Sequence, residues 1–186
     1  MELTLTYVMS QVFTIIMYLL LVISYYAKER KNILILGFLS LIANAIAYVL
    51  LEAYTGLAMC IVAVIRNIIF IIDENKNGKS DTINKKDITL LILLYSLIII
   101  STVFTYDGYL SLLSVFATMI YTYSVWQKKT IVYKLLGIPV GVLWILYNIY
   151  VKSIFGVILE SILLIASITG YIAELRGKKN IEKIQQ

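Results

Sequence analysis

The chain has 186 residues, of which 61% are hydrophobic and only 15% are charged. Soluble domains average about 45–50% apolar and about 25% charged residues, so this composition argues against a soluble globular enzyme. Histidine is absent and Cys60 is the only cysteine, which excludes an intrachain disulfide, a zinc site built from Cys and His, and a catalytic triad that uses His. We expect an all-α integral membrane protein that is not an enzyme and has no metal, cofactor or nucleic-acid partner.

The apolar residues come in runs of about 18 to 22, the length that a helix needs to cross a bilayer core of about 30 Å. We predict seven transmembrane helices, over residues 6–27, 33–51, 55–72, 88–105, 108–125, 131–150 and 153–171. Residues 73–87 are predicted to form a charged cytoplasmic loop, and residues 174–186 a basic cytoplasmic tail.

The cations indicate the orientation of these helices. Of the 16 Lys and Arg residues, 14 fall on one side of the predicted membrane, Lys152 alone falls on the other, and Arg66 lies inside the third helix. Because Lys and Arg accumulate in cytoplasmic loops, the N-terminus is predicted to lie outside and the C-terminus in the cytoplasm.

The first three and the last three predicted helices have matching lengths, which suggests an internal repeat with an offset of 100 residues. Adding 100 to a residue number pairs Gly37 with Gly137, Gly56 with Gly156 and Ser24 with Ser124. We predict a 3+1+3 architecture, in which residues 1–72 and 107–173 form two parallel three-helix repeats and residues 88–106 form an inverter helix that links them.

Polar residues inside the membrane should face the bundle interior or a cavity, because a polar group in contact with lipid is costly. Residues of this kind recur on one face of several predicted helices, and we predict that eight of them line a substrate site: Thr14, Tyr18, Asn44, Ser114, Thr118, Trp144, Asn148 and Glu160. Trp144 and Asn148, one turn apart, would suit a sugar, a nucleoside or another planar polar solute. The alternative is that the small polar residues join helices and that Trp144 fills space.

Two charged residues and one proline stand out within the predicted helices. Arg66 and Glu160 either form a structural ion pair or act on a substrate or proton, with Glu160 as a proton carrier. Pro139 removes a backbone hydrogen bond from the sixth helix, and we predict a hinge there.

The segment WILYNIYVKSIFGVILE (residues 144–160), together with AVIRN (63–67) and KERK (28–31), resembles the YgjV-like bacterial inner membrane proteins. That family is similar to the wider group of SWEET and SemiSWEET sugar transporters, PnuC vitamin transporters and PQ-loop proteins. The resemblance implies two parallel three-helix units, an external N-terminus and a multi-pass protein of the inner membrane. It also implies that Trp144 occupies a substrate-flanking aromatic position, that Asn44 stands where the first unit would have its aromatic residue, and that Cys60 and Glu160 lie near asparagine positions.

The leading functional hypothesis is a facilitator or proton-coupled carrier for a small polar solute, with alternating access around a site between the repeats. The alternative is a non-transporting membrane receptor or scaffold with a SWEET-like fold, as in the KDEL receptor. The basic tail would then contact cytoplasmic partners.

Overall fold

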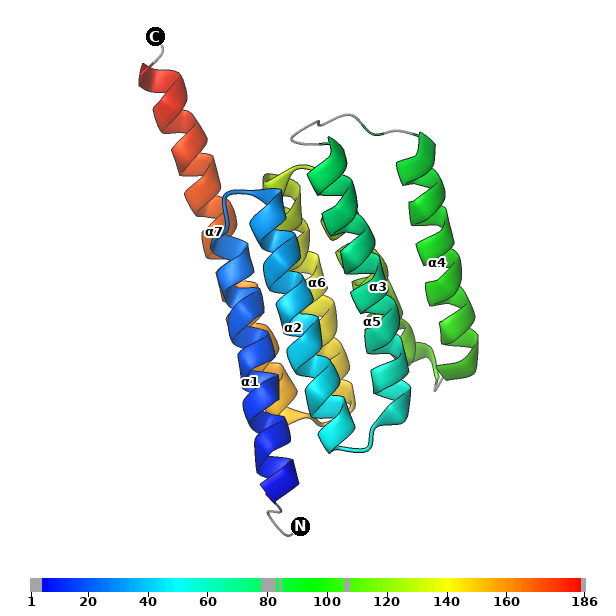
Figure 1. The fold of residues 1–186 in the computed structure, drawn as a ribbon. Helices are drawn as coiled ribbons and strands as arrows, with labels where there is room; N and C mark the ends of the chain where they lie inside the picture. The colour runs from blue at the N-terminus through cyan, green and yellow to red at the C-terminus, as the bar shows by residue number, and fades with distance from the viewer. Residues whose placement is uncertain (1–4, 78–82, 84, 106–107, 185–186) are drawn as a thin grey trace. The chain divides into compact units, whose positions relative to one another are not determined.

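A computed structural model describes residues 5–77, 83, 85–105 and 108–184, and within these residues all regular structure is helical. The helices are α1 (Leu5–Tyr26), α2 (Arg30–Leu50), α3 (Tyr54–Asn77), α4 (Lys85–Thr105), the short 3₁₀ helix η1 (Tyr109–Ser111), α5 (Leu112–Trp126), α6 (Thr130–Tyr150) and α7 (Ile154–Ile184) (Figure 1).

Length and composition make five of the described helices suitable for crossing a membrane. These are α1, α2, Lys85–Val103 of α4, α6, and Ile154–Gly177 of α7, whereas α5 is an apolar helix of 15 residues. Large aliphatic side chains cover the outside of these helices, as at Leu19 and Ile100, which are more than half exposed. An apolar exterior of this kind is the surface expected of helices that face lipid.

The described helices extend beyond the predicted spans where the chain becomes polar. α3 continues to Asn77, and α4 already begins at Lys85, so much of the predicted 73–87 loop is helical. α7 likewise continues through most of the predicted 174–186 tail and ends at Ile184. A helix satisfies its backbone hydrogen bonds internally and therefore continues into water wherever its residues favour helix, so hydropathy locates the lipid boundary rather than the helix end.

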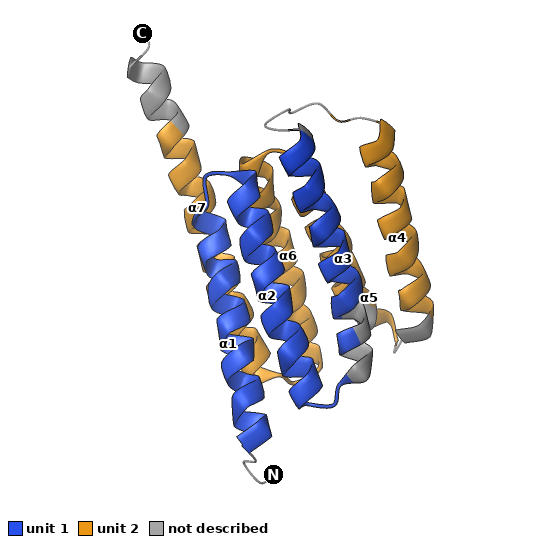
Figure 2. Cartoon of the chain, viewed as in Figure 1, with its two compact units in different colours: residues 1–79 blue, residues 80–186 orange. Residues whose placement is uncertain are grey.

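The chain divides into two compact units, Met1–Lys79 and Ser80–Gln186 (Figure 2). In the first unit, α2 packs against both α1 and α3. In the second unit, α6 packs against both α5 and α7, and α4 packs against α5. The second helix of each three-helix set is therefore the one in contact with both others.

The turns that end α2 and α6 have the same hydrogen bonds, 100 residues apart. The amides of Glu52 and Ala53 donate to the carbonyls of Val49 and Tyr48, at 3.1 and 2.9 Å. The amides of Lys152 and Ser153 donate to the carbonyls of Ile149 and Asn148, also at 3.1 and 2.9 Å. This pairing defines a Schellman motif, and its left-handed residue is Glu52 (φ 55°) in one turn and Lys152 (φ 58°) in the other.

The turns that precede α2 and α6 also correspond at this offset. The buried Ser24 and Ser124 hydroxyls donate to the carbonyls three residues earlier, at 2.6 and 2.7 Å. Glu29 and Lys129 are extended residues before the helices, and each accepts hydrogen bonds from the amides three and four residues later. The chain geometry at both ends of the second helix therefore recurs after 100 residues.

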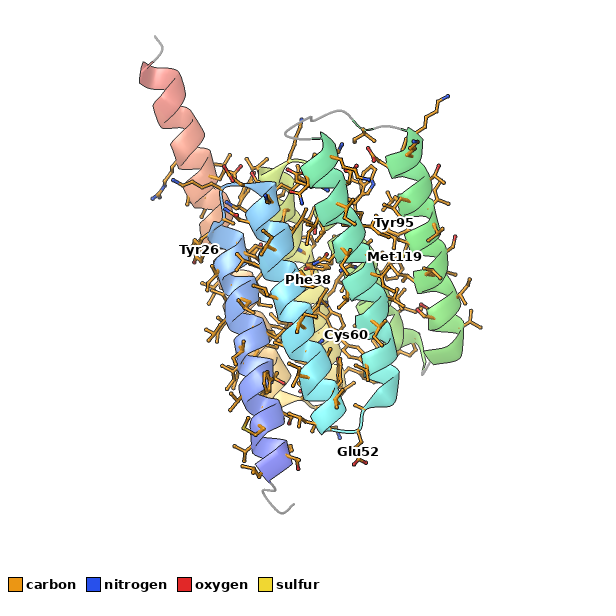
Figure 3. All side chains as sticks on the ribbon, in the orientation of Figure 1. Tyr26, Phe38, Glu52, Cys60, Tyr95 and Met119 are labelled. Carbon is orange, nitrogen blue, oxygen red and sulfur yellow. The ribbon has the colours of Figure 1, made fainter. Side chains whose placement is uncertain are left out.

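The predicted linker helix α4 is attached to α5 within the second unit. Leu94 is buried, and the Tyr95 hydroxyl donates to the Met119 carbonyl of α5 at 3.3 Å (Figure 3). Near the start of α4, the Trp126 indole donates to the Asp87 carbonyl at 2.9 Å. Because the second bond joins the start of α4 to the end of α5 and the first joins the middles of the two helices, α4 and α5 run antiparallel to each other.

Candidate functional site

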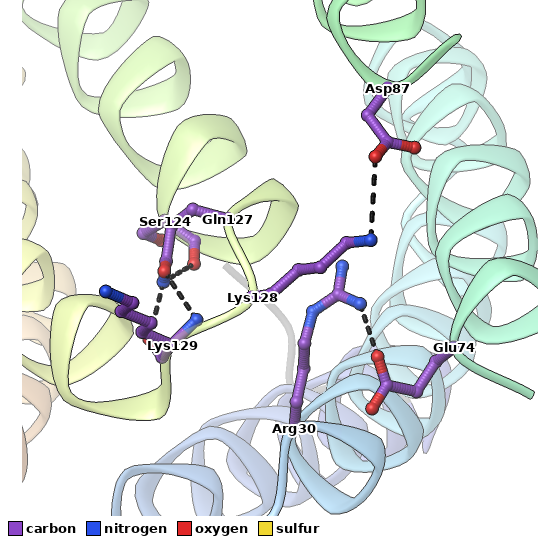
Figure 4. A network of polar contacts seen from close by, with 7 residues as sticks. All are labelled: Arg30, Glu74, Asp87, Ser124, Gln127, Lys128 and Lys129. Carbon is purple, nitrogen blue, oxygen red and sulfur yellow. Dashed lines mark hydrogen bonds and ion pairs between the residues drawn. The ribbon is translucent and has the colours of Figure 1, made fainter. Parts of the chain in front are cut away.

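In the first unit, α2 and α3 are joined by polar contacts near the start of α2. The Arg30 guanidinium pairs with the Glu74 carboxylate, and both side chains are largely buried (Figure 4). One turn further along α2, the Leu34 carbonyl accepts a long hydrogen bond of 3.5 Å from the buried Asn67 amide. Asn67 and Glu74 lie two turns apart on one face of α3, so these contacts form a two-point clamp between the helices.

The second unit has the same clamp at the positions 100 residues later. The Thr130 hydroxyl donates to Glu174 Oε1 at 2.8 Å, and Lys134 Nζ lies 2.9 Å from Glu174 Oε2. The buried Ser167 hydroxyl donates to the Lys134 carbonyl at 2.6 Å. These residues correspond to the clamp of the first unit at the offset of 100: Thr130 to Arg30, Lys134 to Leu34, Ser167 to Asn67 and Glu174 to Glu74. The cation lies one turn further along the second helix, at Lys134.

The predicted site residues of the first unit are buried or half-buried. Thr14 donates its hydroxyl to the Ser10 carbonyl of its own helix at 2.9 Å. Tyr18 and Asn44 are half-buried, and Arg66 is 6% exposed. Cys60 is buried and donates its thiol to the Leu41 carbonyl at 3.2 Å, a structural contact between α3 and α2.

In the second unit, the structure brings two pairs of predicted site residues into hydrogen-bond contact. Thr118 donates to the Ser114 carbonyl at 2.8 Å, and Asn148 donates to the Trp144 carbonyl at 2.9 Å. The Trp144 ring also meets Tyr147 edge-on, with 5.7 Å between the ring centroids. Trp144 and Asn148 are half-buried, so both keep part of their surface available. Glu160 on α7 is 8% exposed.

Asn148 also lies at the contact between α6 and α7. A Cβ atom placed on Gly156 would lie 2.1 Å from Asn148 Oδ1 and 2.8 Å from Ser153 Oγ. The Ser153 hydroxyl accepts the Gly156 amide at 3.2 Å, which is the usual side-chain cap of a helix N-terminus. Asn148 therefore packs against the first turn of α7, a role that is compatible with a substrate contact through its remaining surface.

Pro139, the predicted hinge, is an exposed residue inside α6, which continues through it from Thr130 to Tyr150. Two residues later, α6 approaches α7 closely: a Cβ atom on Gly141 would lie 3.2 Å from Leu164 Cβ. The missing amide of Pro139 leaves the Leu135 carbonyl without its usual helical donor, which is the local weakness that a hinge requires. The hinge itself stays a prediction.

Among the described residues, no group of three or more Cys, Asp or Glu side chains could hold a metal ion.

A family model described as a bacterial inner membrane protein, Imp-YgjV, matches residues 8–176, a range that includes at least part of every helix from α1 to α7. The chain belongs to this family. No curated protein and no solved structure matches the chain significantly. Family membership and the candidate membrane spans make it a multi-pass protein of the bacterial inner membrane, in contact with the lipid bilayer.

The clamp residues were not predicted as a functional or structural group. From the sequence, Lys134 was only one of the cations on the cytoplasmic side, and Glu74 and Glu174 were only parts of the polar loop and tail. The signal was nevertheless present in the amino-acid sequence, because Glu74 and Glu174 are identical residues at the offset of 100. A comparison of the two halves that extends past residue 72 finds them.

Proposed function

We propose that this protein is a carrier for a small polar solute, built from two parallel three-helix repeats that move around a site inside the membrane. In this proposal the chain crosses the membrane seven times, with α4 as the inverter between α1–α3 and α5–α7. The observation that supports it is the recurrence of the same turns and the same helix clamp after 100 residues. Internal repeats of this kind are typical of secondary transporters, whose binding sites lie between the repeats.

In the second unit, the proposed substrate contacts are the half-buried Trp144 and Asn148; in the first unit, the candidate is the half-buried Asn44. An aromatic face beside an amide suits a planar or ring-shaped polar solute such as a sugar or nucleoside. Thr14, Tyr18, Ser114 and Thr118 would line the path, since hydroxyls that donate to their own helix can still accept from a solute. Glu160 would carry a proton if transport is proton-coupled.

Thermal unfolding of the purified protein in detergent, measured across a panel of polar metabolites, tests the proposal. A substrate should raise the unfolding midpoint, and Trp144→Ala should abolish that shift and lower uptake into proteoliposomes at least tenfold. Phe116→Ala is the control, because Phe116 is a 56% exposed aromatic residue of α5 outside the proposed site. If no solute shifts the midpoint and Trp144→Ala leaves uptake unchanged, the carrier proposal fails.

Glu160→Gln separates a facilitator from a proton-coupled carrier. In the coupled case, this variant should keep exchange of solute across the membrane and lose accumulation driven by a pH gradient. Equal accumulation by the variant and the parent protein would exclude Glu160 as the proton carrier.

The second candidate function is a membrane receptor or scaffold that does not transport. The observation that favours it is the length of α7, which is helical over 31 residues from Ile154 to Ile184, more than the about 20 residues that a membrane span needs. A helix that projects beyond the membrane offers a surface to a cytoplasmic partner. Deleting residues 178–186 should abolish the cellular function of a receptor and leave solute uptake by a carrier intact.

A further inference from the structure

At the end of the second unit that contains the start of α4, two of the described carboxylates form ion pairs within the unit. Asp87 Oδ2 lies 3.5 Å from Lys128 Nζ, and Glu174 Oε2 lies 2.9 Å from Lys134 Nζ (Figure 4 shows the first pair). The side chains of Lys128 and Lys134 are only 8% and 4% exposed. Asp87 and Glu174 therefore compensate two buried lysines and leave the exposed cations of this end uncompensated.

Four exposed cations surround these pairs among the described residues of this unit. Lys85 and Lys86 immediately precede Asp87 on α4, Lys129 follows Lys128, and Arg176 lies two residues after Glu174. The paired residues bring these cations to one end, because Asp87 contacts the α5–α6 turn and Glu174 contacts the first turns of α6. The described side chains of this end therefore have an excess of four positive charges.

The turn that carries Lys129 is held in a defined conformation. The Gln127 amide donates to the carbonyls of Ser124 and Lys129, at 2.9 and 2.7 Å, and its oxygen accepts the Lys129 amide at 2.7 Å (Figure 4). Gln127 is 7% exposed, so these bonds are shielded from water. The Trp126 indole donates a hydrogen bond to the Asp87 carbonyl, which holds the start of α4 beside this turn. Because the backbone beside these lysines is already ordered, less conformational entropy is lost when a ligand binds them.

We propose that this end of the second unit binds anionic phospholipid headgroups. Lys85 and Lys86 begin α4, Lys129 immediately precedes α6, and Arg176 is the 23rd residue of α7. Because a membrane span needs about 20 residues, we expect these four cations at the depth of the lipid phosphates. Clustered lysines beside a membrane attract anionic lipids, and each one strengthens binding. The opposite turn of this unit, between α6 and α7, has Lys152 as its one described cation, so the surface is confined to one end.

The test uses the full chain in detergent micelles with added phosphatidylglycerol or phosphatidylcholine. Bound lipids are counted by native mass spectrometry, and the apparent affinity is taken from the rise of the unfolding midpoint. We expect binding to phosphatidylglycerol over phosphatidylcholine. The variant with Lys85→Gln, Lys86→Gln and Lys129→Gln together should lose affinity about a hundredfold, since each lysine contributes about fivefold.

Lys152→Gln is the matched control and should bind phosphatidylglycerol within about twofold of the parent protein. Glycerol phosphate, which has the headgroup anion without acyl chains, distinguishes a lipid from a free anion as the ligand. If the triple variant does not fold, the single variants Lys85→Gln and Lys129→Gln replace it, and 0.5 M salt should weaken binding to the parent protein about tenfold or more. The proposal is overturned if both lipids bind equally, or if glycerol phosphate stabilises the protein as much as phosphatidylglycerol does. It is also overturned if Lys152→Gln loses as much affinity as the other lysine variants.

Discussion

At the scale of single residues, Gly156 is required by the contact between α6 and α7. A methyl group at this position would lie 2.1 Å from Asn148 Oδ1, far inside van der Waals contact. We expect Gly156→Ala to lower the free energy of unfolding by about 2 kcal/mol, since over-packing a closed contact typically costs about 1–3 kcal/mol. The measurement is the unfolding transition of the purified protein in detergent.

Gly177→Ala is the control for this substitution, because nothing lies within 4 Å of a Cβ atom at Gly177. It should be neutral or stabilising, since alanine favours helix over glycine by about 1 kcal/mol. Adding Asn148→Ala to Gly156→Ala should recover part of the lost stability by removing the closest clashing atom. A Gly156→Ala protein as stable as the parent would show that Asn148 can move away freely.

At the scale of helices, the contact of Glu174 with Thr130 and Lys134 joins the later part of α7 to the start of α6. Glu174→Gln should lower the free energy of unfolding by about 3 kcal/mol, because it leaves the Lys134 ammonium, whose side chain is 4% exposed, without its counter-charge. Glu52→Gln, at an exposed carboxylate in the turn after α2, should change stability by less than about 0.5 kcal/mol.

A second variant distinguishes loss of the pair from loss of one partner. Replacing both residues, with Lys134→Met and Glu174→Leu, should be less destabilising than Glu174→Gln alone, because an apolar pair leaves no uncompensated charge. The opposite order of stabilities would mean that Thr130 or another contact of Glu174, rather than the lysine, dominates this clamp.

Hydropathy predicted a helix end accurately only where the helix ends together with its apolar run. Hydropathy placed the C-terminal ends of α2, α5 and α6 within about three residues, because those helices end close to the lipid boundary. The predicted membrane span that ends at residue 171 does not give the end of α7, because this helix continues to Ile184. The clamps could not be predicted from polarity alone: Asn67 and Ser167 resemble ordinary intramembrane polar residues until the carbonyls that they reach are known.

In the predicted site as well, the sequence indicated the polar residues but not their contacts. Arg66 and Glu160 are 6% and 8% exposed, and their role as intramembrane charges stays a prediction. The sequence could not reveal that the hydroxyls of Thr14 and Thr118 donate to their own helices, or that Asn148 packs against Gly156. Those contacts depend on rotamers and on the distance between helices, which a pattern of residue types does not determine.

At the scale of the whole molecule, the number of membrane crossings depends on α3 and α5, which are not among the five candidate spans found in the described residues. α5 together with η1 has a length of about 28 Å, close to the thickness of the bilayer core. Its end is bonded to the start of α4, and its Met119 carbonyl to Tyr95 in α4. Since α5 runs antiparallel beside a candidate span, we expect it to cross the membrane as well.

Seven and five crossings predict opposite locations for two described residues. If α3 and α5 cross, Lys85 lies in the cytoplasm and Tyr109 lies outside; if neither crosses, both locations are reversed, while Lys152 stays outside in either case. Single cysteines at these positions, in a Cys60→Ser background, can be labelled in intact cells with a membrane-impermeant maleimide. We expect at least tenfold more labelling of Tyr109→Cys and Lys152→Cys than of Lys85→Cys, with the difference lost after permeabilisation. Labelling of Lys85→Cys but not Tyr109→Cys in intact cells would establish five crossings and would rule out two parallel three-helix repeats.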